Sequence, residues 1–126
     1  MPPIAKPKIL SWTLHAQAKM NFYKLSPQRV RRVLNAPKRV EEGVAPKTVA
    51  MMQPASLKNA AGRAGGSRAE KWTQEIWVMF QDSVRERRVI SAWRYPGVTK
   101  PRDEAALRAL KKEYNDFIND THEPIV

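Results

Sequence analysis

Three short apolar runs constrain the fold of this chain more than any other feature of its sequence. They span residues 48–53, 72–81 and 88–95, are rich in branched and aromatic side chains, and are short for helices. They predict three consecutive strands, most simply an antiparallel meander. The run around Trp77 shows no alternation of apolar and polar residues, so we expect its strand to be central and covered on both faces. Residues 40–44 can add a fourth strand at the edge.

Helical patterns flank these runs on both sides. Ser11 is placed to cap a helix that begins at Trp12, and the pair Ser26-Pro27 has the capping hydroxyl and the first-turn proline of a second helix start. Asp103 and the acid after it suit the first turn of a C-terminal helix. The sequence therefore predicts an α+β fold with an N-terminal αα-hairpin, a three- to four-stranded antiparallel sheet and a C-terminal helix.

A length of 126 residues predicts a single domain with one modest core. We expect residues 1–10 to form a flexible N-terminus and residues 120–126 to fray at the other end. Residues 54–71 are basic and rich in glycine and alanine, which bury too little area to offset ordering, so this segment is expected to be a mobile loop.

The charge balance limits the partners that such a domain would attract. The chain has 23 Lys and Arg against 12 Asp and Glu, a formal net charge of +11, and no acid before Glu41. A surface field of this sign attracts polyanions, with nucleic acid the first candidate and an anionic membrane or an acidic protein next. The alternative is a solvated basic surface on a protein with another task.

Several classes of chemistry are excluded by composition. Without cysteine the chain has no disulfides, no catalytic thiolate and no zinc site built on thiolates. Two histidines, His15 and His122, are too few for an all-histidine metal site, so we expect no metal and no cofactor. No segment approaches the ~20 apolar residues of a membrane span, and we expect no signal peptide, since the first residues lack an apolar core of sufficient length. We therefore expect a cytoplasmic protein without membrane contact.

The end of the third run provides the candidate site. Arg94 can hold a phosphate with two parallel donors, and Arg88 is expected on the same face of the strand. Tyr95 would point to the opposite face. His15, in the first helix, can give or take a proton near neutral pH and is expected at the boundary of a core stripe that includes Leu14. We interpret His15, Arg94 and Tyr95 as the candidate catalytic residues. The basic residues expected to bind nucleic acid are Lys19, Lys24, Arg29, Arg32, Arg63, Arg68 and Arg88.

Each of these assignments has a structural alternative. His15 can be a hydrogen-bonded residue at the core boundary, and Arg94 can pair with an acid such as Glu75 or Glu113. The tryptophans fit a core. Trp72 or Trp93, each at the end of an expected strand, could instead stack on a base.

The order of helices and strands, with a basic surface and no cysteine, resembles the small RelE-like ribonuclease toxins. The chain is more similar still to BrnT-like toxins. It is also more similar to a related group of uncharacterised prokaryotic domains that have a histidine in the first helix. The resemblance covers most of residues 12–118, but Trp93 stands where BrnT-like chains tend to have arginine, and the loop at 54–71 is longer. It rests on His15, Met20, Ser26, the Val33-Leu34 pair before Pro37, and the strand Arg88–Arg94, which is similar to the R-I-I-S-A-R strand of BrnT-like proteins.

This resemblance implies a metal-independent endoribonuclease of a toxin–antitoxin system, acting on free or ribosome-associated RNA, with an acidic antitoxin that masks the basic face. Two other classes stay open. One is a non-catalytic RNA-binding module of the same fold, and the other is an interaction protein that pairs a sheet edge near Val49 or Val89 with a partner.

Overall fold

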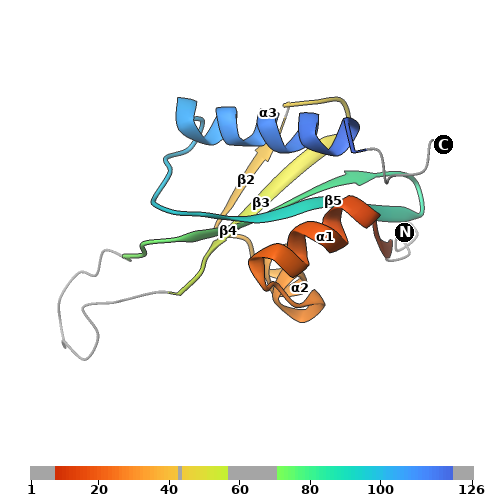
Figure 1. Ribbon diagram of the computed structural model, residues 1–126, viewed down its shortest axis with the longest axis horizontal. Helices are drawn as coiled ribbons and strands as arrows, with labels where there is room; N and C mark the ends of the chain where they lie inside the picture. Colours follow the sequence, from red (N-terminus) through yellow and green to blue (C-terminus); the bar gives the residue numbers. More distant parts are fainter. Residues whose placement is uncertain (1–7, 43, 57–70, 121–126) are drawn as a thin grey trace, which may run out of the picture.

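The computed structural model describes residues 8–42, 44–56 and 71–120, which form a sheet with helices on both faces. In Figure 1, α1 and α2 lie below the sheet and α3 lies above it. The elements are β1 (Ile9–Trp12), α1 (Leu14–Tyr23), α2 (Pro27–Asn35), β2 (Arg39–Glu42), β3 (Thr48–Pro54), β4 (Glu75–Asp82), β5 (Glu86–Tyr95) and α3 (Glu104–Ile118).

The sheet has five strands in the order β1-β5-β4-β3-β2. Strands β2 to β5 are antiparallel neighbours, so the expected meander and its edge strand are present, and the apolar β4 is central. The α+β class is thus confirmed, but the expectation of a purely antiparallel sheet is wrong. The fifth strand, β1, pairs with β5 in parallel, which makes the sheet mixed.

The N-terminal strand was missed because its residues look like the start of a helix. Trp12 pairs with Val89 of β5, and the Ser11 hydroxyl donates to the Glu86 carboxylate instead of capping a helix. The cap is Thr13, whose hydroxyl accepts from the amide of Ala16 at 2.9 Å. The open edge of β5 offers the backbone of residues 9–12 hydrogen bonds that an exposed helix start lacks. The last two residues of the expected flexible N-terminus therefore belong to a strand.

The other two helices begin where the sequence predicts. The Ser26 hydroxyl accepts from the amide of Arg29 at 3.0 Å, with Pro27 in the first turn. The Asp103 carboxylate accepts from the amides of Ala105 and Ala106. These contacts satisfy amide groups that a helix start leaves without partners.

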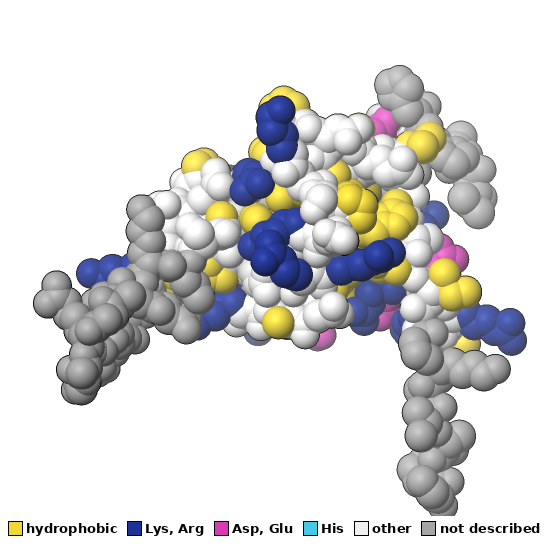
Figure 2. Space-filling view, turned by 90° about the horizontal axis from the view of Figure 1, so that it is seen from below, with side chains coloured by type: hydrophobic (Ala, Val, Ile, Leu, Met, Phe, Trp, Pro, Cys, Tyr) yellow, Lys and Arg dark blue, Asp and Glu magenta, His cyan; other side chains and the backbone are white. Residues whose placement is uncertain are grey.

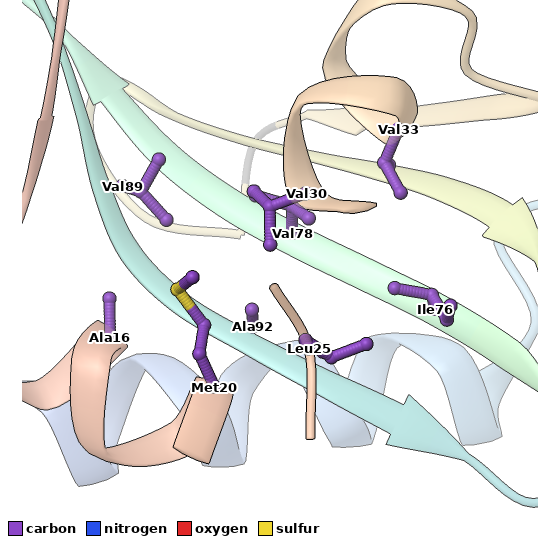
Figure 3. Packing of buried hydrophobic residues seen from close by; sticks show 9 residues of the cluster. All are labelled: Ala16, Met20, Leu25, Val30, Val33, Ile76, Val78, Val89 and Ala92. Carbon is purple, nitrogen blue, oxygen red and sulfur yellow. The ribbon is translucent and has the colours of Figure 1, made fainter. Parts of the chain in front are cut away.

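The core lies in two layers, one on each face of the sheet. Figure 3 shows the lower layer, in which side chains of α1 and α2 point toward β4 and β5. In α1 the inward residues are Ala16 and Met20, whereas Leu14 is 50% exposed and Ala18 is exposed. The expected core stripe that includes Leu14 is therefore wrong, because the packing of α1 against the sheet turns Ala16 and Met20 inward instead. The upper layer packs Trp77, Met79, Ile90 and Trp93 of the sheet against Leu110 and Phe117 of α3.

An ion-pair cluster closes the turn between β4 and β5. Arg87 donates to the Asp82 carboxylate through Nε at 2.9 Å and Nη2 at 3.0 Å, and the Lys8 Nζ lies 3.1 Å from the same group. The hydrogen bond from Arg87, and then that from Lys8, lowers the pKa of Asp82 below its ordinary value of 3.8.

The depressed pKa of Asp82 predicts a pH-dependent contribution to stability. The contribution is present in full above pH 3.8, the ordinary pKa of the group. It is lost as the pH falls through the lower pKa that Asp82 has in the folded protein. Asp82→Asn should therefore lower the free energy of unfolding at pH 7 by less than about 1 kcal/mol, because water screens this half-exposed cluster. Urea unfolding at pH 7 and at about pH 2 should show the difference between variant and wild type shrinking at low pH. A difference that is constant with pH would contradict the assignment.

The described part of the chain contains no helix that is long and apolar enough to cross a bilayer. Parts of three predicted segments lie outside the described residues: residues 1–7 of the N-terminus, most of the loop at 54–71 and the tail from residue 121. Arg63 and Arg68 lie outside them as well.

Candidate nucleic-acid interface

A bulge in β5 separates two arginines that the sequence predicts on one face. The pairing of β4 with β5 shifts between Met79 and Phe80, so that Ile90 is an extra residue in its strand. Ile90 and the next residue both turn toward α3, and the alternation of side chains is inverted beyond them. Arg88 consequently lies over the ring of Phe117, with its Cζ 5.6 Å from the centroid, on the α3 face. Arg94 lies on the opposite face, and the expectation that Arg88 supports it is wrong.

Arg94 is held at the C-terminal end of α1. Its Nε donates to the carbonyl of Tyr23 at 2.8 Å, and its Nη1 donates to the side chain of Gln74 at 3.2 Å. Neither Glu75 nor Glu113 is among its partners within the described residues, so the ion pair considered as an alternative does not form. No carboxylate of the described residues lies at ion-pair distance from Arg94.

His15 has a different environment, between α1 and α3. It is 7% exposed, and its Nδ1 lies 2.7 Å from a carboxylate oxygen of Asp120. Its ring meets that of Phe117 edge to face, with the centroids 5.9 Å apart. One turn later, the Nζ of Lys19 lies 2.9 Å from Glu113, which also accepts from the Ser91 hydroxyl. His15 and Lys19 thus join α1 to α3 beside carboxylates that offset positive charge.

The structure does not bring His15 and Arg94 to one point. Thr13, beside His15, bonds to β5 at Val89, whereas Arg94 bonds to Tyr23 at the far end of α1. At ~1.5 Å per residue, the helix separates these two ends by about 12 Å. Two groups that act on the same phosphate need to lie within a few ångströms of it.

Tyr95 also points away from Arg94. It packs at the margin of the core layer beneath α3, next to Trp93 along the strand. The structure therefore distributes the three predicted catalytic residues over two faces of the sheet and two ends of one helix.

A second arrangement of cations forms on the face that carries α2. Arg29 is bonded to the Gln53 side chain at 2.6 Å and to the carbonyl of Pro54 at 3.1 Å, which hold its guanidinium beside the end of β3. Burial, and then the positive charges of Arg32 and Arg94, lower the pKa of Arg29 from its ordinary value. Gln53, which holds Arg29, and Arg94 both pair with Ile76 in the register of the sheet, and Arg32 lies one turn after Arg29 in α2. The three guanidiniums therefore belong to one face of the sheet.

We define the cationic face as Lys24, Arg29, Arg32 and Arg94. Within the described ranges, none of these four side chains has a carboxylate at ion-pair distance, in contrast to Lys19. Figure 2, which views the molecule from the α1 and α2 side, shows Lys and Arg side chains across the middle, with acidic groups toward the edges. The sequence explains this asymmetry, because neither α1 nor α2 contains an acid.

A shallow groove of about 380 Å³ runs along one side of this face. It is lined by Arg29, Arg32, Ala36, Pro37, Lys38, Gln53, Pro54 and Ala55. The Nζ of Lys38 lies 5.9 Å from the ring centroid of Trp72, which brings an aromatic side chain close to the groove. Lys38 and Gln53 were not among the predicted site residues. Lys38 follows the proline that ends α2 and belongs to the same basic N-terminal third, whereas nothing in the sequence indicates that Gln53 positions Arg29.

The comparisons with known proteins do not assign this site. No protein-family model matches the chain, and no curated protein or solved structure matches it either. Among residues 8–42, 44–56 and 71–120, no group of three acidic or histidine side chains is placed to hold a metal ion. Any function must therefore be argued from the cations themselves.

Proposed function

We propose that this protein binds RNA by holding successive phosphates on the cationic face of Lys24, Arg29, Arg32 and Arg94. The observation on which the proposal depends is that Arg29, Arg32 and Arg94 lie on one face of the sheet without a neutralising carboxylate in the described structure. Gathering like charges destabilises a fold unless an anion offsets them, and a polyphosphate chain offers anions at regular intervals.

The fixed geometry of two of these arginines supports phosphate recognition. Arg29 and Arg94 each use part of the guanidinium to bond to backbone carbonyls and amide side chains, which orients the remaining donors. A guanidinium that is held in this way loses less side-chain freedom when it binds a phosphate. The choice of RNA over DNA rests on the resemblance to ribonuclease toxins.

Arg32→Gln is the cleanest single test, since Arg32 is exposed and its side chain makes no hydrogen bond in the described structure. Binding of a fluorescent single-stranded RNA should weaken, and the slope of log K against log salt should fall by about 0.7 for the lost phosphate contact. Fluorescence anisotropy over a range of salt concentrations measures both quantities.

The matched control is Arg108→Gln, which removes the same charge from the exposed outer side of α3. We expect it to leave the slope unchanged. If both variants change the affinity equally, net charge alone drives binding. If wild-type protein binds no RNA even at low salt, the proposed function is wrong.

A second candidate is RNA cleavage of the toxin type. The part of the chain from α1 to α3 has two helices, four antiparallel strands and a final helix, which supports this candidate, whereas the parallel strand β1 before α1 is absent from the expected order. The chemistry would need a proton acceptor near Arg94 other than His15, because His15 lies at the opposite end of α1 and faces Asp120.

Expression in a bacterial host separates the two candidates. Growth arrest that is relieved by Arg94→Ala in a folded variant, together with cleavage of RNA by the purified protein, would favour the enzyme. A short acidic protein encoded next to this one would indicate a toxin pair. If the purified protein binds RNA but does not cleave it, the non-catalytic RNA-binding module is the candidate that remains.

A further inference from the structure

A cleft on the opposite flank of α2 forms a separate cationic site. Its volume is about 450 Å³, and it lies between the end of α2, β1 and the start of β5. This volume is within the range of small-ligand sites, roughly 300–1,000 Å³. The lining residues are Lys8, Leu10, Arg31, Leu34, Asn35 and Arg87. None of them was among the residues that the sequence predicted for the site.

The positive charges of the cleft come from three separate parts of the chain: Lys8 just before β1, Arg31 in α2 and Arg87 in β5. Asp82 holds both Lys8 and Arg87, and it occupies the Nε and Nη2 of the arginine. The Nη1 of Arg87 and further hydrogens of the Lys8 ammonium remain as donors. Arg31 lies over the ring of Trp12, with its Cζ 5.9 Å from the centroid. Among the described residues, one carboxylate thus faces three cations, which gives this part of the cleft a net positive charge.

The rest of the lining is apolar or neutral. Leu10 and Leu34 are partly buried and pack against the lower core layer, so their remaining surface provides fixed apolar walls. Asn35 adds an amide group that can both donate and accept. A ligand that fits this lining combines a phosphate with a flat, largely apolar group that has hydrogen-bonding edges.

We propose that the cleft between β1 and α2 binds a nucleotide, with Arg31, Lys8 and Arg87 on its phosphate and the base between Leu10, Leu34 and Asn35. This site goes beyond the cationic face, since Arg31 and Arg32 point to different flanks of α2. The nucleotide has two possible sources, a free mononucleotide or one unit of a bound RNA chain.

The test compares wild-type protein with Arg31→Gln and Lys8→Gln, using AMP and UMP as free nucleotides and a single-stranded RNA of about ten units as the chain. Titration calorimetry measures the mononucleotides, and anisotropy measures the RNA. Each variant should weaken binding of the ligand that occupies the cleft by about tenfold. Arg108→Gln is the control and should change neither. Two variants on different elements guard against a local folding defect in one of them.

Loss of mononucleotide binding in both variants, with RNA affinity unchanged, would identify a free nucleotide as the ligand. Loss of RNA affinity in both variants would identify a unit of the chain. If AMP and UMP fail to bind the wild type, and both variants bind RNA as the wild type does, the proposal is overturned, while the cationic face can still bind RNA. Conversely, mononucleotide binding without any RNA binding would support the cleft and reject the function proposed above.

Discussion

Replacing Glu75 by alanine is expected to lower the free energy of unfolding by about 3 kcal/mol or more. Glu75 is fully buried at the start of the central strand β4, and both carboxylate oxygens are in use. Oε1 accepts from the indole of Trp77 at 3.0 Å and from the Thr99 hydroxyl at 2.6 Å. Oε2 accepts from the indole of Trp72 at 2.9 Å and from the amide of Thr99 at 2.8 Å.

The size of this effect follows from what the substitution leaves behind. Alanine would leave four donors without acceptors, three of them buried, and each buried group costs about 1–3 kcal/mol unless water reaches it. Thr99 also accepts from Arg39, so the carboxylate is the centre of a network that fixes the connection between β5 and α3. The network belongs to the fold, and we expect its loss to displace α3.

Urea unfolding followed by circular dichroism measures the loss, and tryptophan fluorescence reports on Trp72 and Trp77. The matched control is Glu42→Ala, because Glu42 is an exposed carboxylate on the edge strand β2. It should change stability by less than about 0.5 kcal/mol. A loss at Glu75 as small as that at Glu42 would mean that the network does not stabilise the fold.

The double charge reversal Lys24→Glu/Arg32→Glu is expected to weaken RNA binding by about 100-fold or more at low salt. Both side chains are exposed on the cationic face, so the substitutions leave the core intact while they change the local charge by four units. The remaining Arg29 and Arg94 would then face carboxylates that compete with phosphate. Binding measured by anisotropy at low and high salt should show the largest loss at low salt.

The control is Arg108→Glu/Lys111→Glu on the outer side of α3, which changes the net charge by the same amount. Repulsion of RNA by a less basic protein would affect both double variants equally. The proposed interface requires the α2 variant to lose much more affinity than the α3 variant. Equal losses would show that no particular face is used.

The sequence predicted the local features of this fold better than its long-range ones. The cap at Ser26, the start of a helix at Asp103 and the central position of β4 follow from short-range patterns, and the structure confirms them. The strand β1 was missed because its four residues gain their hydrogen bonds from β5, a distant part of the chain. Trp12, for example, pairs with Val89, which lies 77 residues later in the sequence. Nothing local distinguishes such a strand from a short lead into a helix.

The candidate site shows the same limit. The excess of cations in the N-terminal third indicated that positive charge would concentrate on one part of the fold, but not which cations would be neutralised. Lys19 faces Glu113 from a distant helix, whereas Arg29 and Arg94 find carbonyls and amides instead. One extra residue at Ile90 moved Arg88 to the opposite face from Arg94, and a run of consecutive buried residues in β5 carries no sign of where its alternation breaks.

Mapping of the RNA-binding surface by NMR tests the central claim most directly. In a titration of the labelled protein with a short single-stranded RNA, the largest shifts should fall on Lys24, Arg29, Arg32 and Arg94, with α3 unperturbed around Arg108. Shifts centred on α3, or none at all at saturating RNA, would contradict an RNA-binding face built on α2.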